Sequence, residues 1–122
     1  MRVKHENLRV WSEAMDLAEQ IYSVSRAFPR REDFALTAQI RRSAASVPAN
    51  IAEGCGRFHT KDFVHFLYIA RGSLFEFMTL LDLAMRLGYF LGDQYGELRR
   101  KSEQVVVALS GLIRSLERRM RV

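Results

Sequence analysis

Apolar residues recur every three to four positions along four stretches of the chain, which is the spacing of amphipathic helices. A phenylalanine–proline pair follows the first stretch, and glycines follow the second and third, as is typical of helix ends. The pattern therefore predicts an all-α chain. We expect helices over Glu6–Ala27, Phe34–Phe58 and Lys61–Leu87, and a fourth that begins near Asp93.

The second stretch, Phe34–Phe58, carries three different faces. Its apolar face is expected in the core and consists of Leu36, Ile40, Ala44, Val47, Ile51, Cys55 and Phe58. A second face of small side chains allows another helix to approach closely and consists of Ala38, Ala45, Ala49 and Ala52. Pro48 removes one backbone donor and crowds the preceding turn, so we expect a kink in this helix.

The first and fourth helices are each predicted to place one stripe in the core. The stripe of the first consists of Leu8, Trp11, Ala14, Met15, Ala18, Ile21, Tyr22 and Ser25, with Trp11 as the anchor. The stripe of the fourth alternates by four and three and consists of Leu98, Ser102, Val105, Leu109, Leu112 and Leu116. Thr60 and Asp93 are the expected N-caps of the third and fourth helices.

The third helix is apolar on two sides. One face consists of Phe63, Leu67, Ala70, Leu74, Phe77, Leu81 and Ala84, and the other of Phe66, Ile69, Ser73, Leu80, Leu83 and Leu87. Because a helix with two apolar faces must be covered twice, we expect the bundle to cover one face and a neighbouring subunit the other. Gly72 lowers helix stability, which indicates a close backbone approach at that point.

Glu76 lies inside the second apolar face, where an unpaired carboxylate is costly. We therefore expect it to meet a donor such as Gln39, Arg41 or Asn50. We favour a structural polar network over a ligand site for the residues of this group, which are Gln39, Arg41, Asn50, Glu53, Arg71, Ser73 and Glu76.

Three motifs in this part of the chain resemble the 23S rRNA-intervening-sequence protein family. They are QIRR at 39–42, SVPANIAEG at 46–54 and RGSLFE at 71–76, and the resemblance runs from about Leu8 to the end of the chain. It implies an antiparallel up-down four-helix bundle, often a ring of five, without an established enzymatic activity. The chain is also similar to the accessory variability protein of diversity-generating retroelements, which implies a homopentamer, nucleic acid and a reverse transcriptase as partners.

Composition adds a basic charge to this picture. The 122 residues predict one domain, 1–122, with a formal net charge of +5 and a pI of about 9.9. Sixteen of the 19 basic residues are arginines, which suit bidentate contacts to phosphate. Such a charge favours nucleic acid as a partner. A GC-rich genome would also raise the arginine content, and an acidic protein or membrane headgroups would also suit a basic surface.

The expected nucleic-acid contacts lie on the outer face of the fourth helix. They are Arg100, Arg114, Arg118 and Arg121, helped by Arg99, Lys101 and Arg119. The chain has no recognised base-reading motif, so we expect backbone-directed, salt-dependent binding of RNA or DNA. A merely solvated face is one alternative. A scaffold for an acidic or other protein partner is another.

No pattern of catalytic, cofactor or metal-binding residues is found. His59 and His65 are six positions apart, which fits neither a metalloprotease helix nor a zinc finger, and no glutamate precedes a histidine by three residues. Cys55, the single cysteine, belongs to an apolar face and indicates a reducing compartment. Met1–Val10 lacks the apolar core of a signal peptide, and the apolar runs are short, so we expect a cytoplasmic protein without a membrane span.

Overall fold

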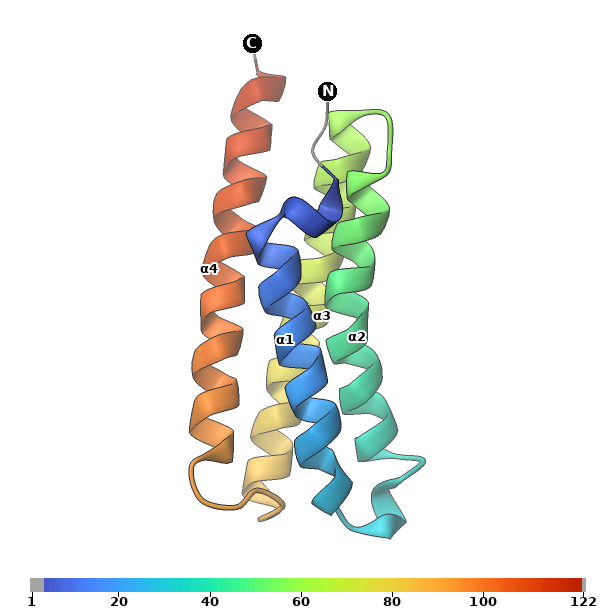
Figure 1. Ribbon diagram of the computed structural model, residues 1–122, viewed down its shortest axis with the longest axis vertical. Coiled ribbons are helices and arrows are strands. Elements are labelled where there is room, and N and C mark those ends of the chain that lie inside the picture. The colour runs from blue at the N-terminus through green and yellow to red at the C-terminus, as the bar shows by residue number, and fades with distance from the viewer. Residues whose placement is uncertain (1–3, 122) are drawn as a thin grey trace.

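The structure is a computed structural model that describes residues 4–121, and in these residues four long helices run side by side (Figure 1). Neighbours in the sequence run in opposite directions, so the predicted all-α, up-down four-helix bundle is confirmed. Residues 1–3 and 122 of the predicted domain lie outside the described residues. The helices are α1 (Arg9–Val24), α2 (Leu36–Cys55), α3 (Thr60–Arg86) and α4 (Gln94–Met120), with short 3₁₀ helices η1 (His5–Asn7), η2 (Ser25–Ala27) and η3 (Arg30–Glu32).

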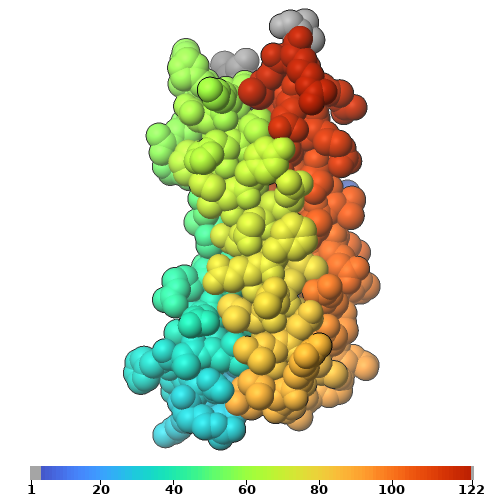
Figure 2. Space-filling model, turned by 180° about the vertical axis from the view of Figure 1, so that it is seen from behind, coloured from blue at the N-terminus to red at the C-terminus, as the bar shows by residue number. Residues whose placement is uncertain are grey.

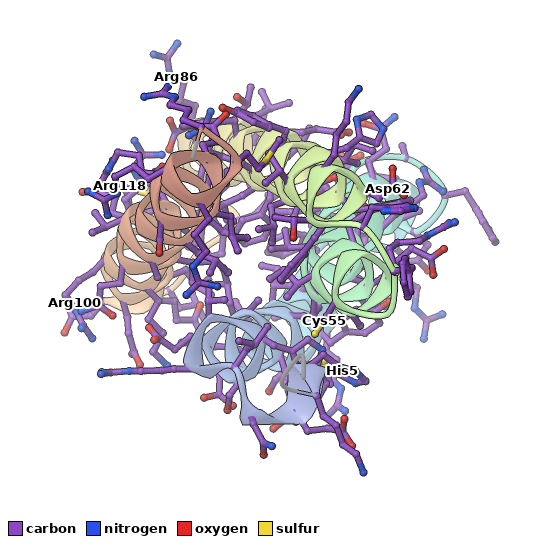
Figure 3. All side chains as sticks on the ribbon, turned by 90° about the horizontal axis from the view of Figure 1, so that it is seen from above. His5, Cys55, Asp62, Arg86, Arg100 and Arg118 are labelled. Atoms are coloured by element: carbon purple, nitrogen blue, oxygen red, sulfur yellow. The ribbon has the colours of Figure 1, made fainter. Side chains whose placement is uncertain are left out.

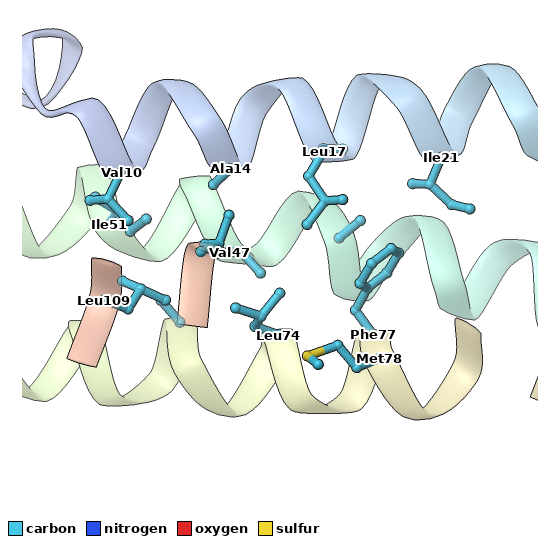
Figure 4. Packing of buried hydrophobic residues seen from close by; sticks show 14 of the residues in the cluster. Val10, Ala14, Leu17, Ile21, Val47, Ile51, Leu74, Phe77, Met78 and Leu109 are labelled. Atoms are coloured by element: carbon cyan, nitrogen blue, oxygen red, sulfur yellow. The ribbon is translucent and has the colours of Figure 1, made fainter. Parts of the chain in front are cut away.

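One face of each helix is buried in a common core (Figure 4). All seven residues predicted for the first face of α3 are buried, as are the predicted apolar residues of α2 except Phe58. In α4 the stripe is confirmed at five of its six positions. The sixth, Leu112, is only partly buried, and its neighbour Ile113 occupies the core. Residues of high sequence separation therefore share one continuous apolar interior.

The predicted core stripe of α1 is partly wrong. The buried residues are Val10, Ala14, Leu17, Ala18 and Ile21, whereas Met15 and Tyr22 are 42% and 44% exposed. Trp11 is partly buried and packs against the edge of the core. The stripe is rotated, so that smaller aliphatic side chains of α1 enter the core and the larger ones lie at the boundary with α2. There they line a groove of about 390 Å³ together with Ala45, Ala49 and Ala52.

The structure also bears on the predictions for the helix ends and for the proline inside α2. Phe58 is 91% exposed and not in the core, because α2 ends at Cys55 and the following turn leaves the helix axis. His59, rather than Thr60, occupies the N-cap position of α3, while Asp93 does occupy that of α4, without a capping hydrogen bond from its side chain. Helix α2 continues through a buried Pro48. The kink there stays a prediction.

Among the described residues, α3 has the length and apolar composition that a membrane-spanning helix needs. The core helix of a soluble protein can share these properties, and 39% of the apolar window is buried inside this bundle. Helix α3 packs against both α2 and α4. We therefore interpret it as the core helix.

Candidate nucleic-acid interface

The predicted polar network consists of separate links between pairs of helices. Between α2 and α3, the hydroxyls of Ser46 and Ser73 are 2.9 Å apart. The Asn50 amide donates to the Ser46 carbonyl at 2.8 Å and to its hydroxyl at 2.9 Å. These bonds satisfy polar groups along the contact between the two helices, and they involve Asn50 and Ser73 of the predicted network.

Arg41 and Arg71 link other pairs of helices. Arg41 reaches the end of α1, where it donates to the Ser25 hydroxyl at 2.8 Å and the Tyr22 carbonyl at 3.2 Å. Arg71 of α3 donates to the Ser110 hydroxyl of α4 at 3.1 Å and lies over the Tyr68 ring. Both motif arginines therefore hold neighbouring helices together.

The expected partner for Glu76 is absent among residues 4–121. Glu76 and Gln39 are exposed, and neither forms a side-chain hydrogen bond or ion pair with another described residue. Phe66 and Ser73 of the predicted second face of α3 contact α2, whereas Glu76 lies on the exposed side of the helix. Glu53 is also on the surface, where it pairs with Arg57 at 2.6 Å.

The basic residues near the start of α4 are held by partners within the bundle. Arg99 lies 3.6 Å from Asp82 of α3 and 3.4 Å from Glu103. Lys101 lies 3.5 Å from Glu97 and donates to Gln20 of α1 at 2.8 Å. A phosphate would have to compete with these carboxylates and this amide.

Arg100 points outward from α4, but it lines a groove that also contains two glutamates (Figure 3). Glu13 and Glu103 are these glutamates, and Arg9 is the other basic residue there. The mixed charge makes this groove a weaker anion site than the sequence pattern indicates.

The last turns of α4 differ from its first turns. Arg114, Arg118, Arg119 and Arg121, which we call the terminal arginine cluster, are all exposed, and none forms an ion pair with a carboxylate in the described part of the chain. Arg118 points away from the bundle axis (Figure 3). At about 1.5 Å per residue, Arg100 lies about 21 Å along the helix from Arg114. Val107, 70% exposed, lies between them. The predicted basic stripe is therefore divided into two groups, one near Arg100 and the other formed by the terminal arginine cluster.

Glu117, the acidic residue within this cluster's sequence, is turned toward α3. The Tyr68 hydroxyl donates to its carboxylate at 2.8 Å. That hydrogen bond raises the pKa of Tyr68, with smaller contributions from burial and from the Glu117 charge, while Arg71 opposes the rise. The contact keeps the carboxylate on the α3 side of α4.

A cavity of about 710 Å³ opens at the same end of the bundle as the terminal arginine cluster. Its apolar wall consists of Leu8, Cys55, Phe63, Leu112 and Leu116, and its polar lining of Arg57, Thr60, Ser115 and Arg119. Phe58, in the turn between α2 and α3, also lines it. The sequence pattern does not predict this site, because it combines the N-terminal segment, one turn and a distant helix end.

The histidines and Cys55 lie apart from any cluster of metal-ligating side chains within residues 4–121. His59 and His65 are exposed, and no three side chains of the metal-ligating types come together in this part of the chain. Cys55 is buried at 8% exposure in the wall of the cavity.

Comparisons with known proteins find a matching family model and similar solved structures. The family model described as 23S rRNA-intervening sequence protein matches residues 6–111. Among solved structures, a protein of unknown function from the S23 ribosomal protein family of Bacteroides thetaiotaomicron is similar, with a TM-score of 0.80 and 26% identity. The likeness covers 92% of this chain and 99% of that one. A search of curated proteins gives no match.

Proposed function

The chain belongs to the 23S rRNA-intervening sequence protein family, and on this premise we propose that it is a non-catalytic protein that binds the phosphate backbone of nucleic acid. The terminal arginine cluster is the proposed contact. The observation that supports it is the exposure of four arginines without a carboxylate partner among the described residues. The family's description refers to ribosomal RNA, which makes RNA our first choice of nucleic acid.

Electrostatics explain why this cluster is a better phosphate site than the start of α4. A guanidinium that already pairs with a carboxylate must give up that partner before it can neutralise a phosphate. The terminal arginines need no such exchange, so their attraction to a polyanion is available in full, and counterions released from the nucleic acid drive binding. We therefore reduce the proposed contacts to Arg114, Arg118, Arg119 and Arg121.

We further propose that copies of the chain assemble through the outer face of α3, as a ring of five by the family resemblance. Ile69, Leu83 and Leu87 of that face are 38%, 45% and 49% exposed. A Cβ added to Gly72 would meet no described atom within 4 Å, so the close approach expected there is not made within this chain. A ring would repeat the arginine cluster, and modest contacts would add through multivalency.

The test is a salt titration of RNA binding by the nuclease-treated protein, after light scattering of the same sample. Arg118→Gln/Arg121→Gln should reduce the slope of log affinity against log salt by about one for each phosphate that is no longer neutralised. Arg99→Gln/Lys101→Gln is the matched control and should leave the slope unchanged. A mass near one chain would refute the assembly. Absence of wild-type binding at low salt would refute the proposed function.

A further inference from the structure

The open end of the bundle carries an aromatic ring that backbone binding does not require. We propose that this end binds single-stranded nucleic acid in preference to duplex, with an unpaired base stacked on Phe58 and the terminal arginine cluster on the adjacent phosphates. The proposal rests on the proposed function and deepens it by naming the form of nucleic acid and a base-contacting residue.

Phe58 is placed where a base can reach it. Gly54 and Gly56 end α2, and the ring that follows them is 91% exposed. His59 contacts the ring edge-on, at 5.0 Å between centroids and 87° between planes. An exposed aromatic ring beside a basic surface is the usual platform for unstacked bases.

The cavity joins the ring to one arginine of the terminal arginine cluster, Arg119. Phe58 and Arg119 line the same space of about 710 Å³, which is within the range of ligand pockets. Thr60 and Ser115 bring hydroxyl groups to its lining. Because a hydroxyl both donates and accepts hydrogen bonds, these residues can meet the edge of any base. Binding of this kind tolerates many sequences.

Three acidic residues of this end are placed so that they do not repel a nucleic-acid strand bound along α4. Glu53 is paired with Arg57 at 2.6 Å, and Glu117 accepts a hydrogen bond from Tyr68 at 2.8 Å. Asp62, in the first turn of α3, lies on the other side of the bundle from Arg118 (Figure 3). The charged residues that line the cavity between Phe58 and the end of α4 are Arg57 and Arg119, and both are basic.

Stacking explains the preference for single strands. A ring on a short turn can cover only a base whose face is exposed, and in a duplex those faces are covered by neighbouring base pairs. A duplex would meet the arginines alone. Single strands of RNA and DNA share the phosphates and the base faces, so both should bind.

The experiment compares Phe58→Ala with wild type on fluorescent oligouridylate, oligothymidylate, a duplex of the same length and a strand of abasic sites. Phe58→Ala should reduce the affinity for both base-bearing strands roughly tenfold and leave the affinity for the duplex and the abasic strand unchanged. Phe58→Trp should retain affinity, and its fluorescence should be quenched by the strands. Phe34→Ala, which removes another fully exposed ring at the opposite end, is the matched control and should bind as wild type does.

Two results would overturn the inference while leaving the proposed function intact. One is an unchanged single-strand affinity in Phe58→Ala, and the other is an equal loss of affinity for the duplex. Failure of the proposed function is distinguishable, because the wild-type protein would then bind none of the four probes at low salt. A reduced affinity for oligouridylate alone would support the inference for RNA only.

Discussion

The two ends of the bundle each present an exposed phenylalanine on a connecting turn, yet their surroundings differ. At the end that contains Phe34, an aromatic cluster closes the bundle, with Phe28 5.5 Å from Tyr89 and 5.4 Å from Phe90 between ring centroids. At the end that contains Phe58, the bundle is open to a cavity of about 710 Å³. The space-filling view shows the C-terminal turns of α4 beside the start of α3 at that end (Figure 2).

Polar groups follow the same division. At the closed end the Tyr89 hydroxyl donates to Glu32 at 2.7 Å, and the Tyr95 hydroxyl of α4 donates to Asp82 of α3 at 2.6 Å. At the open end the terminal arginine cluster has no described carboxylate partner. One end therefore uses its polar groups in contacts within the chain, while the other leaves the terminal arginine cluster available for a ligand.

The largest effect should come from opening the closed end. Phe28→Ala removes a ring that is only 5% exposed, and the free energy of unfolding should fall by about 3–5 kcal/mol. Phe34→Ala, at the same end but on a fully exposed residue, should change it by less than about 0.5 kcal/mol. Urea unfolding followed by circular dichroism measures both. Equal midpoints for the two variants would show that the aromatic cluster does not close this end.

An intermediate effect is expected where α2 and α3 approach each other beside the open end. A Cβ added to Gly54 would lie 2.7 Å from the Phe66 Cβ and 3.1 Å from the Phe63 carbonyl oxygen. Gly54→Ala should therefore destabilise the protein by about 1–3 kcal/mol, because the helices must move apart. Gly96→Ala, where a Cβ meets nothing within 4 Å, is the control and should not destabilise. Unchanged urea unfolding in Gly54→Ala would mean that the turn before Phe58 is not fixed by this contact.

The helices and the buried face of α3 could be predicted from the sequence. Seven apolar residues of α3 follow a single helical spacing, and all seven are buried. The buried face of α1 could not be predicted in the same way. Two neighbouring series, one with Trp11 and Met15 and one with Val10 and Ala14, both have helical spacing. Choosing between them requires the volume left by α2 and α4. Phe58 was misplaced because the apolar period continues past the glycines that end the helix.

Many residues of the candidate site could be named from the sequence, but the contacts that they make could not. Helical periodicity placed Arg100 and Arg118 on one face, and both are exposed. Periodicity could not show that Asp82 of α3 and Gln20 of α1 engage Arg99 and Lys101, since these contacts depend on how the helices pack. The same limitation applies to Glu76, whose environment depends on the rotation of α3.

The smallest effect is a pH dependence at the closed end. The hydrogen bond to Asp82 raises the pKa of Tyr95, helped by burial and the Asp82 charge and opposed by Arg99. Because the folded pKa lies above the unfolded value of 10.0, the stabilisation is complete below pH 10 and is lost as the pH rises through the folded pKa. Tyr95→Phe should therefore have a slightly lower urea midpoint than wild type near neutral pH, and the difference should shrink in alkaline solution. A difference that stays constant with pH would show that the Tyr95 hydroxyl does not titrate against Asp82, and that loop packing alone closes this end.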